Sequence, residues 1–96
     1  MKVAPKIELV EVENEGLFAL MGKQVEIGCN VYIYTGILVG VNDTCIKLED
    51  AAIVYETGEL TASTYKDAQR FYTDSKVPRY IPLSLMENFG QSFKKY

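Results

Sequence analysis

The strongest constraint on the fold is a run rich in β-branched and aromatic residues between residues 24 and 56, which opens with Val25 and Ile27 alternating with the polar Gln24 and Glu26 in a period of two. Such alternation places one face of each segment in a core and the other in water, which is typical of β-strands. Asn30 and Asn42-Asp43 are turn residues that divide the run. The run therefore predicts three consecutive strands, at 24–28, 31–41 and 46–56.

Two irregularities predict that the longer strands bend. Gly36 interrupts the second strand, and a glycine inside a strand usually marks a bulge or a sharp bend. In the third strand the alternation slips at Glu49-Asp50, which predicts a bulge at that point. Long, bent strands favour a small sheet that curls on itself.

The segments around these strands are expected to be short elements. Asn14 would cap the apolar run 15–21 and Gly22 would end it, so we expect a short helix there. Residues 59–76 carry apolar side chains near one face at helical spacing, and we expect a short helix, with an extended hairpin tip as the alternative. Two final strands are expected at 77–81 and 85–89, on either side of a tight turn.

The chain is expected to form one domain. Its 96 residues leave little room for a second core. We expect an N-terminal arm or short edge strand at 1–13, a barrel domain at 14–90 with an insertion at about 59–76, and a frayed tail at 91–96. No apolar run approaches the eighteen residues of a membrane span, and the N-terminus does not resemble a signal peptide, so we expect a cytoplasmic protein that does not bind membranes.

The absence of histidine excludes several kinds of chemistry. Without an imidazole there is no Ser-His-Asp or Cys-His pair and no Cys₂His₂ zinc site. Cys29 and Cys45 do not form a CxxC pair and are expected as reduced thiols, with a disulfide as the less favoured alternative. We therefore expect neither a cofactor nor an enzyme.

The net charge of −3 hides an uneven distribution of charge. Residues 1–65 carry four lysines against ten acidic residues, a net charge of −6, and residues 66–96 carry six basic against three acidic residues, a net charge of +3. The negative net charge disfavours binding of nucleic acid by the molecule as a whole. The local field decides which partners approach, however, so the basic C-terminal part can still contact nucleic acid. Solvated faces of both signs are the alternative reading.

Three segments resemble the first motif of the Sm and Sm-like protein family. They are Gly22-Lys23-Gln24-Val25-Glu26-Ile27, Gly36-Ile37-Leu38-Val39-Gly40-Val41-Asn42 and Ile46-Lys47-Leu48-Glu49-Asp50-Ala51. The resemblance covers about residues 15–56. Within the family, the chain looks most like a divergent member of bacterial or phage type. It implies a mostly β, Sm-like (SH3-type) barrel of five strongly bent strands with a short N-terminal helix and the insertion at 59–76.

The second motif of the family is altered in this chain. Arg79-Tyr80-Ile81-Pro82-Leu83-Ser84-Leu85 stands in its place and lacks the Arg-Gly pair of the family. Asn42-Asp43-Thr44-Cys45 likewise stands where the family has Asp-x-x-Met-Asn.

The resemblance implies binding of single-stranded RNA, or DNA, at the two loops around the pore of a homo-oligomeric ring of about five to seven subunits. The candidate nucleic-acid-binding residues are Asn42, Asp43, Thr44, Arg79, Tyr80, Pro82 and Ser84. The candidate oligomer interface comprises Arg79, Tyr80, Ile81, Leu85, Met86 and Phe89. Each has an ordinary alternative: Asn42-Asp43 as a plain turn, Tyr80 in the core, Arg79 paired with an acid, and the last strands as parts of a monomeric barrel.

A further group interleaves the basic residues Lys66, Arg70 and Lys76 with Tyr65, Phe71 and Tyr72. It is either a nucleic-acid surface or a helix that packs its aromatic face inward, and the second reading is favoured. The leading functional hypothesis is thus a ring that binds nucleic acid in RNA or DNA processing. The alternative is a structural or adaptor ring that binds proteins through its acidic N-terminal face.

Overall fold

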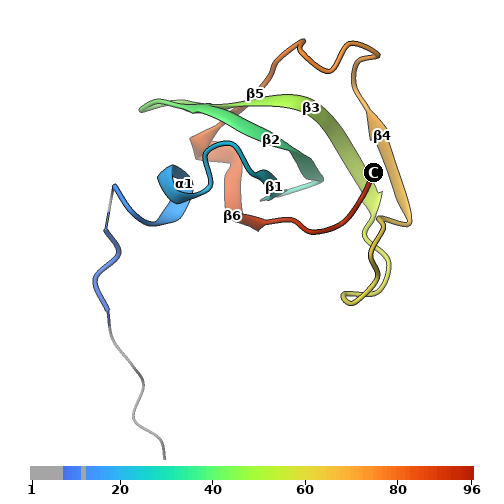
Figure 1. Cartoon of the computed structure of the whole chain (residues 1–96), viewed down its shortest axis with the longest axis horizontal. Helices are drawn as coiled ribbons and strands as arrows, with labels where there is room; N and C mark the ends of the chain where they lie inside the picture. Colours follow the sequence, from blue (N-terminus) through green and yellow to red (C-terminus); the bar gives the residue numbers. More distant parts are fainter. Residues whose placement is uncertain (1–7, 12) are drawn as a thin grey trace, which may run out of the picture.

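The computed structural model describes residues 8–11 and 13–96 (Figure 1). Much of the predicted arm, residues 1–7 and 12, lies outside the described residues. The elements in chain order are α1 (Gly16–Ala19), β1 (Gln24–Cys29), β2 (Ile33–Val41), β3 (Cys45–Glu56), β4 (Asp67–Arg70), β5 (Arg79–Pro82), the 3₁₀ turn η1 (Leu83–Leu85) and β6 (Met86–Gln91). The described chain is therefore mostly β, with one short α-helix.

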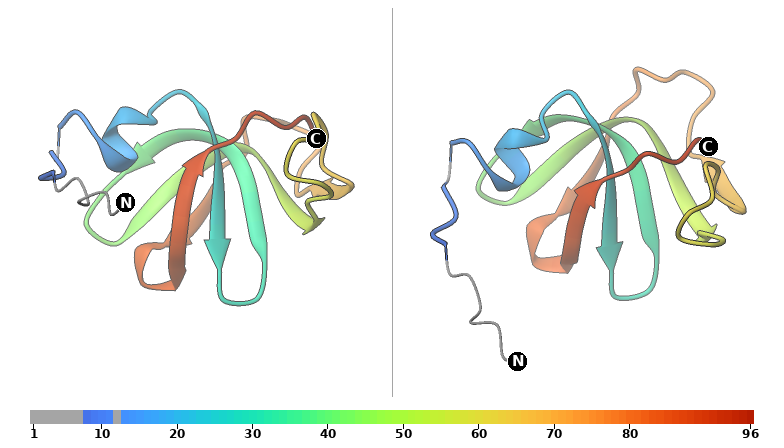
Figure 2. Two further views of the ribbon diagram at one scale, coloured as in Figure 1. Left: turned by 90° about the horizontal axis from the view of Figure 1, so that it is seen from below. Right: turned by 60° about the horizontal axis from the view of Figure 1, so that its bottom comes forward.

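The six strands form one antiparallel sheet that curls around its core (Figure 2). The order of the main path is β4-β3-β2-β1-β6, and β5 pairs with β3 beside it. The long strand β3 pairs with β2 along one edge and is shared by two strands along the other, by β5 at residues 45–48 and by β4 at residues 52–56. Since β5 and β6 do not pair with each other, the sheet that the described residues form is not closed.

The core lies inside the curl. Its buried side chains come from alternate positions of β1, β2, β3 and β5, as expected when one face of each strand turns inward. They are Val25, Ile27, Leu38, Ile46, Leu48, Ala51 and Ile81. Helix α1 covers one end of the curl with Leu17, which packs against this cluster.

The bend predicted at Gly36 and the bulge predicted at Glu49-Asp50 are one feature. Thr35 pairs with Ala52 and Ile37 with Glu49, so β3 contains one residue more than β2 at this point. A Cβ atom on Gly36 would lie 3.1 Å from the Glu49 carbonyl oxygen, which is closer than ordinary van der Waals contact, so glycine favours the close approach of the two backbones.

Three local predictions are wrong. No helix forms at 59–76; this segment contains strand β4, because the edge of β3 beyond its bulge offers backbone partners that an isolated short helix cannot match. The sheet consequently has six strands and not five. Asn14 does not cap α1: Glu15 is the N-cap residue, and the Asn14 amide donates to the Glu11 carboxylate at 2.9 Å.

The C-terminal tail, predicted to fray, is bound to the rest of the molecule. The backbone N–H of Ser92 donates to the Gln24 carbonyl at 2.9 Å, and the N–H of Lys95 donates to the Ser63 carbonyl at 2.9 Å. The buried hydroxyl of Tyr65 lies 2.6 Å from the Ser92 hydroxyl. Because these contacts join residues far apart in sequence, local patterns do not reveal them.

None of the helices in the described ranges has the length and apolar character needed to cross a membrane.

Candidate nucleic-acid interface

The first predicted loop is the turn between β2 and β3, and the side chain of Asn42 builds it. The Asn42 Oδ1 atom accepts hydrogen bonds from the backbone N–H of Thr44 at 2.8 Å and of Cys45 at 2.9 Å, and from the Thr44 hydroxyl at 3.1 Å. This is the Asx arrangement that makes asparagine a good turn residue. The side-chain oxygen Oδ1 of Asn42 therefore already accepts hydrogen bonds within the turn.

The surroundings of this turn are acidic. Asn42 and Asp43 line an open hollow whose walls also carry Glu11 and Glu15. Its apolar part comes from side chains of three separate segments, namely Val10, Leu17, Phe18, Val41 and Leu83. Carboxylates at the rim of such a hollow repel a phosphate backbone.

The two predicted loops lie side by side. The backbone N–H of Leu83 donates to the Thr44 carbonyl at 2.9 Å, and Cys45 pairs with Pro82 at the end of the β3–β5 ladder. Pro82 and Ser84 are exposed next to the 42–44 turn. These contacts bring together five of the seven predicted residues, Asn42, Asp43, Thr44, Pro82 and Ser84, and a sixth, Tyr80, shares a separate hollow with Asn42.

Arg79 lies at the other end of β5, on an aromatic platform that the sequence did not predict. Its guanidinium carbon is 4.0 Å from the centroid of the Phe71 ring, and its Nη1 donates to the Tyr72 hydroxyl at 3.3 Å. The Phe71 ring stacks in turn on Tyr34, with centroids 6.1 Å apart and an angle of 26° between the rings. Among the described residues, no carboxylate lies within 4.0 Å of Arg79. Arg79 is therefore an exposed, held and uncompensated positive charge.

Tyr80 is 56% exposed, so it is not part of the core. It pairs with Lys47 across the β3–β5 ladder. Together with Gly40 and Asn42 these two residues line a shallow hollow on the outside of the sheet. This hollow connects Tyr80 to the 42–44 turn, whereas Arg79 lies outside it.

The residues predicted for the oligomer interface divide into two groups. Ile81 is 5% exposed and Met86 packs against the core, so their side chains face inward. Tyr80, Leu85 and Phe89 are exposed by 56%, 58% and 41%. Tyr80 and Leu85 also line a hollow of about 130 Å³ beside β5, with Cys29, Tyr34 and Arg79 on its walls. Exposed apolar side chains therefore lie on or next to both β5 and β6.

The outer edge of β5 has no strand partner among residues 8–11 and 13–96. Hydrogen-bonding residues alternate along an antiparallel ladder. The Leu83 N–H is directed at the chain just before β3. By this alternation the backbone N–H and C=O groups of Ile81 and Arg79 are directed at β3, and those of Tyr80 are directed away from it. The outer edge of β6 is likewise free, because β6 pairs only with β1 in the described sheet. Free edges of this kind favour pairing with another strand.

The basic and aromatic group at 65–76 is not a helix with its aromatic face inward. Tyr65 is 5% exposed and belongs to the network that holds the tail, while Phe71 and Tyr72 are half-buried beneath Arg79. Lys66 forms an ion pair of 3.5 Å with Glu56. The alternation of basic and aromatic residues at 65–76 had indicated Phe71 and Tyr72 as candidates. Only the fold shows that Phe71 stacks on Tyr34 and that both residues contact Arg79.

The described part of the chain contains neither a cluster of metal-binding side chains nor a disulfide. No group of three or more Cys, Asp or Glu side chains there could hold a metal ion. Cys29 and Cys45 are both free and half-buried, as expected. Burial and the charge of Glu87 raise the pKa of Cys29, which favours an unreactive thiol.

Comparisons with known proteins do not identify the chain: no protein-family model matches it, and no match was found among curated proteins or solved structures.

Proposed function

We propose that this protein is an Sm-like subunit that assembles with copies of itself and binds single-stranded nucleic acid, RNA in the first place, along strand β5. The observation that carries the proposal is the position of Arg79. Its guanidinium rests on Phe71 and has no carboxylate partner among the described residues. A planar, stacked guanidinium with free donors suits phosphate oxygens and also stacks on bases.

Tyr80 and Lys47 lie on the opposite face of β5 from Arg79, and the hollow beside β5 that both Arg79 and Tyr80 line connects them to this site. Tyr80 is exposed and lies beside Lys47, so a base can stack on its ring while the ammonium group approaches a phosphate. Stacking on an exposed aromatic ring contributes about 1–3 kcal/mol per base and tolerates every base. The proposal therefore predicts weak sequence preference.

The first loop has a different role in this proposal from the one that the family resemblance implies. The Asn42 side-chain oxygen Oδ1 is used by the turn, and Asp43 shares its hollow with Glu11 and Glu15. We therefore assign Asn42, Asp43 and Thr44 to the shape of the loop and place the nucleic-acid contacts on Arg79 and Tyr80.

Self-assembly is supported by the two free edges of the open sheet. β5 and β6 are short, are joined by the turn η1 and carry exposed apolar side chains at Tyr80, Leu85 and Phe89. Pairing β5 of one copy with β6 of the next would satisfy both edges and close into a ring. A ring of about five to seven copies, as the resemblance implies, multiplies a weak contact through effective concentration.

The test of nucleic-acid binding is a titration of fluorescent oligo(U) and oligo(A) at several salt concentrations. Arg79→Ala should weaken binding of both oligonucleotides and make the slope of log K against log salt shallower by about 0.7, the value for one lost phosphate contact on a single strand. Tyr80→Ala should weaken binding without changing that slope. Tyr55→Ala, at a tyrosine that is 49% exposed on the last part of β3, is the control and should bind like the wild type. Absence of binding at micromolar protein, or binding that salt does not affect, would refute the proposal.

The test of assembly is the native mass of the purified chain by light scattering. We expect a discrete oligomer, and Leu85→Glu or Phe89→Glu should reduce its mass by placing a charge at an apolar contact. A wild-type monomer at micromolar concentration would remove the ring and its multiplied contacts from the proposal.

A second candidate function is that of an adaptor that binds a protein partner. The observation that favours it is the hollow beside the 42–44 turn, where apolar Phe18 and Leu17 lie next to Glu11, Glu15 and Asp43. Reversing the charges at Glu11 and Glu13 should weaken partner binding in this case, while Arg79→Ala and Tyr80→Ala leave it intact.

A further inference from the structure

We propose that Arg70 is a second phosphate-binding residue, held in position by Asp50 and Tyr96. The inference rests on the proposed binding of single-stranded nucleic acid and extends it to a part of the surface outside the two loops. Arg70 is the last residue of β4, on the far side of the sheet from the 42–44 turn.

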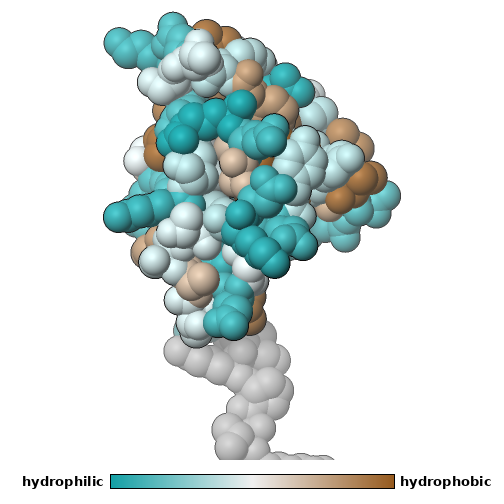
Figure 3. All heavy atoms as spheres, turned by 90° about the vertical axis from the view of Figure 1, so that its right-hand side faces the viewer, coloured by the Kyte–Doolittle hydropathy of each residue, from teal (hydrophilic) through white to brown (hydrophobic). Residues whose placement is uncertain are grey.

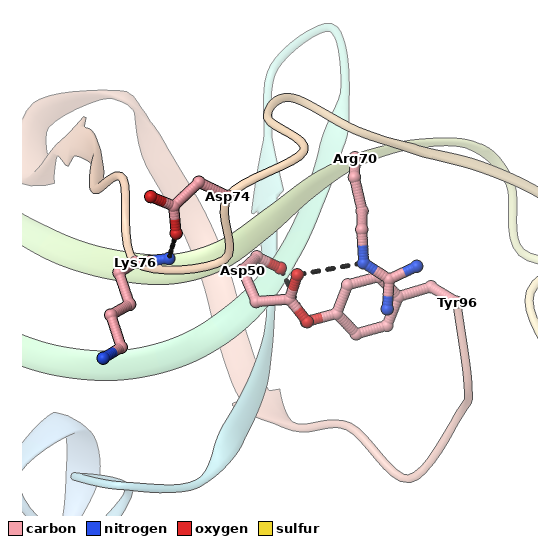
Figure 4. A network of polar contacts seen from close by, with 5 residues as sticks. All are labelled: Asp50, Arg70, Asp74, Lys76 and Tyr96. Carbon is pink, nitrogen blue, oxygen red and sulfur yellow. Dashed lines mark hydrogen bonds and ion pairs between the residues drawn. The ribbon is translucent and has the colours of Figure 1, made fainter.

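The side chain of Arg70 is fixed by two contacts of different kinds. Its Nε donates to the Asp50 Oδ1 atom at 2.9 Å, and its guanidinium carbon lies 4.5 Å from the centroid of the Tyr96 ring (Figure 4). The first contact fixes the direction of the guanidinium and the second fixes its plane. The hydrogen bond to Asp50 also raises the pKa of Arg70, so the charge is permanent.

The contact with Asp50 uses only one edge of the guanidinium. Both terminal nitrogens of Arg70 point away from the Asp50 carboxylate (Figure 4). A guanidinium has five N–H donors, so four remain on these two nitrogens. The Arg70 side chain is 47% exposed, and polar side chains cover most of the face on this side of the molecule (Figure 3). The remaining fork is thus presented to solvent in the geometry that binds phosphate.

Asp50 and Tyr96 are themselves held by the backbone. Asp50 has a left-handed conformation with φ of 49°, and its N–H donates to the Ser75 carbonyl at 2.7 Å. The Tyr96 hydroxyl donates to the Asp50 carbonyl at 2.7 Å. A binding side chain supported by groups that are fixed in this way is preorganised, which lowers the entropy cost of binding.

Arg70 is connected to the proposed Arg79 site through Phe71. Phe71 follows Arg70 in the chain, its N–H donates to the Ala51 carbonyl at 3.0 Å, and its ring carries the Arg79 guanidinium. Two fixed guanidiniums are therefore tied to the same residue, one through the backbone and one through the ring. The ligand that fits this pair is the sugar–phosphate backbone of one single strand that continues from Arg79 to Arg70.

The decisive variant is Arg70→Ala in the titration with oligo(U) and oligo(A). We expect weaker binding of both oligonucleotides and a slope of log K against log salt that is shallower by about 0.7. Lys66→Ala removes the same charge four residues away, from a lysine paired with Glu56, and is the matched control. It should leave both the affinity and the slope unchanged.

The role of Tyr96 is separated from that of the charge by two further variants. Tyr96→Leu removes the ring under Arg70 without any change in charge and should weaken binding. Tyr96→Phe keeps the ring and should retain most of the wild-type affinity. A loss of affinity that follows the ring, with the oligomer mass unchanged, is not expected from a merely structural tyrosine.

The inference is overturned if Arg70→Ala binds like Lys66→Ala. Should Arg70→Ala not fold, Arg70→Lys decides, since it keeps the charge but lacks the fork: weaker binding supports the inference and wild-type binding overturns it. If the wild type binds no oligonucleotide, the proposed function itself fails. If the wild type binds and Arg79→Ala weakens binding while the Arg70 variants do not, only the second phosphate contact is wrong.

Discussion

Among the described titratable residues, Tyr96 has a strongly perturbed pKa. Burial and the neighbouring Asp50 raise its pKa to about 12. Its hydroxyl donates to the Asp50 carbonyl, and this hydrogen bond requires the protonated phenol. Tyr96 thus has a structural role that depends on its protonation.

The raised pKa predicts how stability changes with pH. Because the folded state binds the phenolic proton more tightly than the unfolded state, whose tyrosine pKa is about 10, the contribution of Tyr96 to the free energy of unfolding is complete below pH 10. It is lost as the pH rises from about 10 to about 12. The measurement is urea denaturation at several pH values, with Tyr96→Phe as the control. The difference in stability between the two proteins should change over this interval, and a constant difference would contradict the assignment.

At the scale of elements, the bend of β2 over β3 decides the shape of the sheet. The extra residue of β3 lies opposite Gly36, and a side chain there would be in tight contact with the β3 backbone. Because β3 turns at this point, its first part pairs with β5 and its last part with β4.

Gly36→Ala should therefore destabilise the protein by about 1–3 kcal/mol, as expected for overpacking of a well-packed site. The added Cβ would meet the Glu49 carbonyl oxygen at 3.1 Å and the Ala51 Cα atom at 3.2 Å, and these are backbone atoms that cannot move alone. Gly90→Ala in β6 is the matched control, since a Cβ there has no neighbour within 4 Å. It should change the free energy of unfolding by less than about 0.5 kcal/mol. Equal effects of the two substitutions in chemical denaturation would show that Gly36 is not a close-contact position.

At the scale of the whole molecule, the C-terminal tail connects parts that are distant in sequence. The Gln24 side-chain amide donates to the Lys94 carbonyl at 2.7 Å, and the Lys94 ammonium group donates to the carbonyls of Thr57 and Glu59 at 2.8 and 2.6 Å. The tail thereby joins β1 to the loop after β3.

Deletion of residues 92–96 should release the loop at 57–66. The Tyr65 N–H donates to the Lys95 carbonyl at 3.0 Å, so its protection against hydrogen exchange should fall, while the amides in the ladder between β1 and β2 keep theirs. Lys95→Ala leaves the backbone bonds in place and should retain the protection of Tyr65. If the deletion leaves Tyr65 as well protected as in the wild type, the tail does not hold this loop.

The β-branched and aromatic runs of residues 24–56, the glycine at 36 and the slip at Glu49-Asp50 were enough to predict β1, β2 and β3 and their bend, because strand-forming composition and backbone approach are local properties. Only the tertiary structure decided that residues 59–76 contribute strand β4, since the edge of β3 offers partners that no local pattern contains. The same holds for the candidate site. The sequence indicated Arg79 and Tyr80, but the placement of Arg79 on Phe71, the use of Asn42 in its own turn and the support of Arg70 by Tyr96 depend on contacts between segments far apart in the chain. Such contacts form only when the curled sheet brings those segments together.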